Sequence, residues 1–337
     1  MEELETFVNI FLNKSQAESE EKREEAVQLV HAIRSEPEGF LQLIENFLTF
    51  KVDPPKRFTF HVIKSIILQR WMDICPNFIE PVFQFLFQIT TEISIYQLLE
   101  EETAQELAQT QACFVAKTFP ELIPDFLTPF EAVSDIVKLR FIEALCMNIA
   151  FPAPPVIFHA SKFQELIPAF IELIFAGVQQ MFPVAFSALS FIVRWAGSEW
   201  LGNAECVQSV GAGFSIPNLK AATADVMTAL LMSTGEEHAV EIITQFGIPD
   251  RVNEILEGED DSAILLAYAR LISAAGNATL QNAECCGLFF QYAITNFFTS
   301  PDNAISSTVL SFVDTYTSLN AEVAPTVLAN VISRLAM

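Results

Sequence analysis

Basic residues and glycine are scarce in this sequence. Its 337 residues include 18 lysines and arginines against 42 aspartates and glutamates, so the formal net charge is -24. Non-specific binding to nucleic acid is disfavoured, because Lys and Arg side chains have to neutralise the phosphates. Glycine numbers 11 and proline 17, while 51% of the residues are hydrophobic, which excludes collagen-like and disordered chains.

Catalytic and metal-binding motifs are also missing. The sequence contains no phosphate-binding loop, dinucleotide fingerprint, nucleophile elbow, HExxH or EF-hand pattern. None of the four histidines lies at metal-ligand spacing from another histidine or a cysteine. Acidic pairs such as Glu24 and Glu25 lie in polar runs that are typical of solvated helix ends. We therefore predict that the chain is not an enzyme and that it has no cofactor and no metal.

The six cysteines lie in apolar segments without CxxC spacing, which indicates a reducing compartment. The adjacent Cys285 and Cys286 could form a redox-active pair. We interpret them instead as two small apolar residues within a helix.

Apolar residues recur at helical spacing along nearly the whole chain, and the hairpin dipeptides Asn-Gly and Asp-Gly are absent. The chain is longer than a single core of about 250–300 residues. Prolines recur at the starts of the apolar segments, which pair into about eight helical hairpins with a period near 40 residues, typical of HEAT arrays. We predict an all-α protein, a right-handed α-solenoid of HEAT-like hairpins. The paired segments are 17–34 with 37–50, 54–73 with 76–91, 101–119 with 120–130, 131–150 with 161–178, 181–197 with 200–214, 217–233 with 235–246, 262–275 with 282–298, and 303–318 with 321–335.

Two other architectures fit part of this pattern. A globular helical bundle would use the same helices, although bundles of this length usually need longer ones. Residues 173–193 carry no formal charge and are long enough to span a membrane. Gln179, Gln180 and Pro183 interrupt that stretch, so we predict two buried helices that meet at a turn.

The acidic charge is unevenly distributed. The first 70 residues contain 9 basic and 12 acidic residues, whereas the other 267 contain 9 basic and 30 acidic residues. This excess would attract a basic protein partner. It would equally keep a very apolar chain in solution.

Five segments in collinear order carry a family resemblance, namely 57–71, 139–145, 216–225, 265–276 and 300–313. The segment at 300–313, with its Ser-Ser-Thr-Val followed by Phe, is the most distinctive. Together they resemble the importin-β (karyopherin) superfamily, and within it the amino-terminal part of the tRNA exportins (exportin-T). The segment at 57–71 is similar to an outer helix of the second exportin repeat.

The resemblance implies a monomeric receptor that shuttles between nucleus and cytoplasm through the nuclear pore. Its partners would be Ran-GTP, tRNA as the cargo, and FG-repeat nucleoporins, without membrane insertion. Residues 1–130 would form HEAT repeats 1–3, which bind Ran, and residues 131–337 would form repeats 4–8. Ran would contact the second helices of the first repeats, on a set of polar residues, namely Glu38, Gln42, Glu45, Asn77, Glu80, Gln84 and Gln88.

The chain has fewer repeats than the family's arrays, so it would be either an amino-terminal portion or a reduced relative. Few basic residues are available for tRNA phosphates in the later repeats, and the candidates are Lys138, Arg140, Lys162, Arg194 and Lys220. Three alternatives stay open. The chain could be another importin or exportin, a HEAT scaffold for proteins unrelated to transport, or a helical-bundle hydrolase.

Overall fold

The computed structural model describes residues 24, 28, 37–50, 53–69, 78–150, 163–196, 199–325, 327 and 329. The chain divides into two compact units, Met1–Leu166 and Ile167–Met337. The described residues form helices, turns and loops and contain no strand. The predicted all-α helical solenoid is confirmed.

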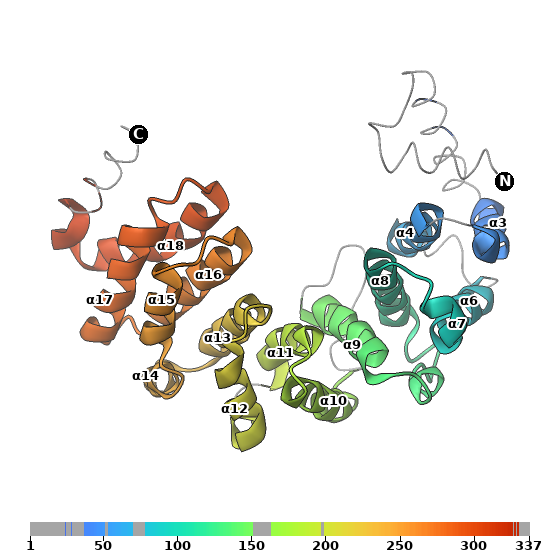
Figure 1. Ribbon diagram of the computed structural model, residues 1–337, viewed down its shortest axis with the longest axis horizontal. Helices are drawn as coiled ribbons and strands as arrows, with labels where there is room; N and C mark the ends of the chain where they lie inside the picture. Colours follow the sequence, from blue (N-terminus) through green and yellow to red (C-terminus); the bar gives the residue numbers. More distant parts are fainter. Residues whose placement is uncertain are drawn as a thin grey trace. The chain divides into compact units, whose positions relative to one another are not determined.

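In the first unit, three helices lie side by side and form one layer (Figure 1). These are α4 (Asp53–Gln69), α8 (Glu101–Thr118) and α9 (Asp135–Ala150). The other elements of the unit pack against this layer or against one another. They are α3 (Pro37–Asn46), η2 (Phe47–Thr49), α6 (Ile79–Thr91), α7 (Ile93–Tyr96) and the 3-10 turn η3 (Thr128–Phe130).

Phenylalanine rings join the α4–α8–α9 layer of the first unit to the elements that pack against it. Phe87 of α6 and Phe130 of η3 both contact Phe141 of α9, and the rings of Phe130 and Phe141 stack with centroids 4.6 Å apart. All three side chains are buried. Burial of each ring stabilises the fold by about 1.5–3 kcal/mol, so the aromatic residues of this unit serve mainly as core.

The second unit repeats the arrangement with a layer of four helices (Figure 1). The layer consists of α11 (Pro183–Ala196), α13 (Lys220–Ser233), α16 (Ser262–Ala278) and α18 (Asn303–Leu319). The remaining elements are α10 (Ile167–Gln179), η5 (Glu199–Gly202), α12 (Ala204–Gly213), α14 (Glu236–Gln245), α15 (Ile248–Leu256), α17 (Ala283–Tyr292) with a π-helical turn, η6 (Ala293–Phe297), and η7 (Ala321–Val323).

Local sequence explains where these helices begin. Asn203 and Asn282 accept hydrogen bonds from the backbone N–H three residues on, at 2.9 and 3.0 Å. Asp261 and Asp302 accept from the N–H two residues on, both at 2.8 Å. Each of these side chains satisfies a backbone donor that would otherwise lack a partner at the helix start.

The interpretation of residues 173–193 as two helices is confirmed. Helix α10 ends at Gln179 and α11 begins at Pro183, with Met181 in the left-handed conformation at φ 59° between them. Within the described part of the chain, we find no helix with the length and apolar character needed to cross a bilayer.

Two details of the predicted hairpins are wrong. Residues 120–130 form turns and the short η3 rather than a helix, because Pro120, Pro124 and Pro129 cannot donate helical hydrogen bonds. Asp125 organises this turn by accepting from the N–H groups of Leu127 and Thr128 at 2.9 and 3.2 Å. An additional helix, α15, follows α14 and belongs to none of the predicted hairpins. The predicted segment at 17–34 lies largely outside the described residues.

Two glycines of α12 provide a matched test of the packing between helices. A Cβ added at Gly213 would lie 2.8 Å from Cε1 of Phe186 on α11 and closer still to Oγ1 of Thr223 on α13, whereas a Cβ at Gly211 would meet nothing within 4 Å. We expect Gly213→Ala to destabilise the fold by about 1–3 kcal/mol through overpacking. Gly211→Ala should be neutral or stabilise it by up to about 1 kcal/mol. Urea unfolding of the two variants measures both effects, and equal midpoints would contradict this account.

Candidate functional site

The candidate Ran-binding residues on α6 form one exposed row. Glu80, Gln84 and Gln88 are all exposed, at the i, i+4 spacing that places side chains on one face of a helix. The opposite face buries Val82 and Leu86. Gln84 donates to Glu80 at 2.7 Å, and Gln88 donates to Glu92 at 2.6 Å. Both hydrogen bonds join residues four apart in the same segment and, among the described residues, none joins the row to another helix, so a partner could approach these exposed side chains.

The other candidates of this set are described less fully. Glu45 is exposed on α3. Glu38 and Gln42 also belong to α3, but their side chains lie outside the described part of the structure, as does the whole of Asn77. The structure therefore places three of the seven residues on one continuous helical face.

The basic residues considered for tRNA are paired with acidic side chains wherever the structure describes them. Lys220 Nζ lies 2.9 Å from Glu259 Oε2, and Lys138 Nζ lies 3.6 Å from Asp135 Oδ1. Arg140 forms an ion pair with Glu101, and it also donates to the hydroxyl of Tyr96 at 3.1 Å. Lys162 and the side chain of Arg194 are outside the described residues. A phosphate would have to compete with a carboxylate at each described position.

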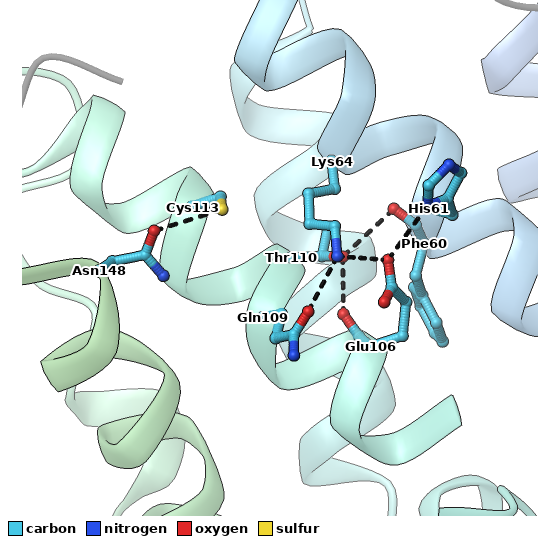
Figure 2. A network of polar contacts seen from close by, with 8 residues as sticks. All are labelled: Phe60, His61, Lys64, Glu106, Gln109, Thr110, Cys113 and Asn148. Atoms are coloured by element: carbon cyan, nitrogen blue, oxygen red, sulfur yellow. Dashed lines mark hydrogen bonds and ion pairs between the residues drawn. The ribbon is translucent and has the colours of Figure 1, made fainter. Parts of the chain in front are cut away.

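A polar network between α4 and α8 was not predicted from the sequence (Figure 2). Lys64 Nζ lies 2.6 Å from Glu106 Oε1 and donates to Gln109 Oε1 at 2.9 Å. His61 Nδ1 approaches Glu106 Oε1 to 3.5 Å. The side chains of Lys64 and Glu106 are each only 17% exposed, so the pair is screened from water much more than a surface ion pair.

Opposing effects set the pKa of Glu106. Burial alone would raise the pKa, but hydrogen bonds and charge interactions with His61 and Lys64 outweigh burial and lower it below 4.5. The single hydroxyl proton of Thr110 is shared between the carbonyl oxygens of Glu106, at 2.7 Å, and of Phe60 on α4, at 3.2 Å. The network thus holds α4 against α8 through charge and backbone contacts (Figure 2). The sequence provides only a weak indication of this pair. Lys64 and Glu106 are separated by roughly one repeat period, and that spacing alone does not say which side chains meet.

Burial keeps the described cysteines protonated. It raises the pKa of Cys113 to about 11 and that of Cys146 to about 12. Cys286 is also buried, with a pKa of about 11, and its thiol lies 3.4 Å from the carbonyl of Gly276. A protonated thiol is a poor nucleophile and a poor metal ligand. Among the residues that the structure describes, no group of three or more His, Cys, Asp or Glu side chains could hold a metal ion.

Replacing Lys64 tests how much the buried Lys64–Glu106 pair contributes to stability. An exposed ion pair between the same two helices provides the comparison. Lys64→Met should lower the free energy of unfolding by about 1–3 kcal/mol at pH 7, because Glu106 keeps its burial cost and loses its main counter-charge. The pKa of Glu106 is depressed in the folded state, so its stabilisation is present above pH 4.5 and is lost as the pH falls through the folded pKa. The difference in the free energy of unfolding between wild type and Lys64→Met should therefore vanish at acid pH, where Glu106 is protonated in both proteins.

The matched control is Arg57→Met, which removes the ion pair with Glu102. The side chain of Glu102 is 75% exposed, so this change should cost less than about 1 kcal/mol. Urea titrations from pH 3 to 7 measure both variants. If the two substitutions cost the same, or if the cost of Lys64→Met does not depend on pH, the account of Glu106 is wrong.

Comparison with known proteins identifies no family. No family model matches the sequence, and no curated protein matches it. One solved structure found in the comparison, described as the crystal structure of an engineered protein, is 13% identical. The match covers 94% of this chain and 98% of that chain at a TM-score of 0.34. Such a distant likeness carries no information about function.

Proposed function

We propose that this chain is a nuclear transport receptor of the importin-β type, which binds Ran-GTP through α3 and α6 and carries tRNA as its cargo. The observation that supports the proposal best is the exposed row of Glu80, Gln84 and Gln88 on α6. The row belongs to an all-α helical solenoid, which is the architecture that this function requires. The position of the row agrees with the helices that the resemblance implies for Ran binding.

Charge constrains how such a receptor would bind RNA. The net charge of -24 repels phosphates at long range. The described candidates Lys138, Arg140 and Lys220 are already paired with carboxylates. We therefore propose that tRNA binds tightly only to the complex with Ran-GTP, whose formation offsets the repulsion.

Nucleotide-dependent binding of Ran is the first test. Immobilised Ran loaded with GTP should retain the chain, and Ran loaded with GDP should not. The double variant Glu45→Lys/Glu80→Lys should weaken binding to Ran-GTP by about tenfold or more, because both residues lie on the proposed surface. Glu131→Lys, which reverses the charge of an exposed residue outside α3 and α6, should change the affinity by less than about twofold. Circular dichroism should show the same helix content in all variants.

Binding that ignores the nucleotide, or no binding to either form of Ran, would contradict the transport proposal and favour a HEAT scaffold for other proteins. If Ran-GTP binds but the double variant binds as tightly as Glu131→Lys, then the surface on α3 and α6 is wrong, although the function stands.

The cargo is tested by cooperativity. Saturating mature tRNA should increase the affinity for Ran-GTP by about 5- to 100-fold, because two ligands that favour one conformation strengthen each other reciprocally. A protein cargo exportin would show no such effect of tRNA. Fluorescence titration of labelled Ran-GTP, with and without tRNA, measures the coupling. An unchanged affinity would contradict the assignment of tRNA as the cargo.

A further inference from the structure

Two adjoining hollows lie on the α11–α13–α16–α18 layer of the second unit. One has a volume of ≈ 610 Å³ and the other ≈ 450 Å³, both within the range of about 300–1,000 Å³ that is usual for ligand sites. Thr228 and Arg270 line both hollows, so the two adjoin, and we call the pair the α13 groove. Its polar lining includes Asp225, Glu236, Arg270 and Asn277, together with several serine and threonine hydroxyls.

The hydroxyl groups of the groove are available as acceptors. Each hydroxyl has one proton, and five of the lining residues donate theirs to backbone carbonyls. Ser190 and Thr234 donate at 2.7 Å, Thr228 and Thr308 at 2.8 Å, and Ser273 at 3.1 Å. Their remaining lone pairs can only accept. A ligand that satisfies these oxygens must therefore supply hydrogen-bond donors, as the N–H groups of a polypeptide do.

The charge of the second unit also favours a positively charged ligand, which carries hydrogen-bond donors. The second unit contains 17 acidic and 5 basic residues, which gives a net charge of -12. Arg270 lines the groove, but its Nε and Nη2 donate to the two carboxylate oxygens of Asp225, both at 2.9 Å. Lys220 and Arg251 are paired with Glu259 and Glu254. An anion would meet no unpaired basic side chain among those described in this unit, whereas a cation would be attracted.

Glu236 is suited to anchor such a cation. It lines the larger hollow, and its Oε1 accepts from the backbone N–H of Gln281 at 2.5 Å, which fixes the carboxylate. Ala274, Ala278 and the 64% exposed Met232 provide apolar surface in the same hollow. A lysine or arginine can lay its aliphatic stem on such a surface and direct its charged end to a carboxylate.

We propose that the α13 groove binds an extended, lysine- or arginine-bearing segment of a protein partner, with Glu236 as the anchor. The backbone and side-chain N–H groups of the segment donate to the hydroxyl oxygens, and the apolar floor takes the stem of a basic side chain. This site is separate from the surface on α3 and α6, and it does not depend on the proposed binding of Ran.

A short fluorescein-labelled peptide of alternating lysine and serine tests the site by fluorescence anisotropy. It should bind the full chain, and a peptide of alternating glutamate and serine should not. Glu236→Gln should weaken binding of the lysine peptide by about tenfold, because the anchoring charge is lost while the amide oxygen still accepts from Gln281. Asn277→Trp should abolish binding, because an exposed lining residue becomes bulky enough to fill the hollow.

Glu237→Gln is the matched control. It removes the same charge from the next residue of α14, which is exposed and does not line the groove, so it should change the affinity by less than about twofold. Equal weakening by Glu236→Gln and Glu237→Gln would mean that long-range charge alone attracts the peptide. That result, equal binding of the glutamate peptide, or no binding of the lysine peptide would overturn the proposal. None of these measurements involves Ran, so the outcome is independent of the transport function.

Discussion

The structure depends on lateral packing between successive helices, because a single helical hairpin cannot bury its apolar face alone. In the first unit, this packing runs through α4, α8 and α9, and in the second through α11, α13, α16 and α18. At some contacts, neighbouring helices approach so closely that only a glycine fits between them. At Gly276 of α16, for example, a Cβ would overlap the ring of Phe312 on α18. The sequence period near 40 residues follows from this packing, because each hairpin has to return one helix to the same layer.

Polar side chains use the same lateral contacts. Lys64 reaches Glu106 on the next helix of its layer, and Arg270 reaches Asp225 in the same way. These pairs cross-link neighbours that are already packed, so their side chains lose little additional freedom. These pairs leave the net charge of -24 unchanged, but they occupy several of the few basic side chains, so the excess acidic charge dominates the remaining surface. That surface suits a basic polypeptide better than a nucleic acid.

The two proposed surfaces differ in how far the sequence could lead to them. The row of Glu80, Gln84 and Gln88 follows from spacing on one helix, so the sequence predicted its common face correctly. The α13 groove combines residues of α11, α13, α14, α16 and α18. No short pattern links these positions. Whether a hydroxyl donates to its own helix, and so becomes an acceptor toward the groove, is visible only in the structure.

The sequence by itself determined the all-α architecture, the turn near Pro183 and most helix boundaries, because helical periodicity, prolines and capping residues act within a few residues of one another. It failed at residues 120–130, where prolines interrupt an apolar pattern, and the predicted hairpins did not include α15. Only the tertiary structure decided which charges are paired. Lys138, Arg140 and Lys220 looked available for phosphates in the sequence, and each faces a carboxylate in the structure. For Arg140 and Lys220, that carboxylate lies 39 residues away in the chain. Such pairing depends on which helices lie side by side, and local sequence does not specify it.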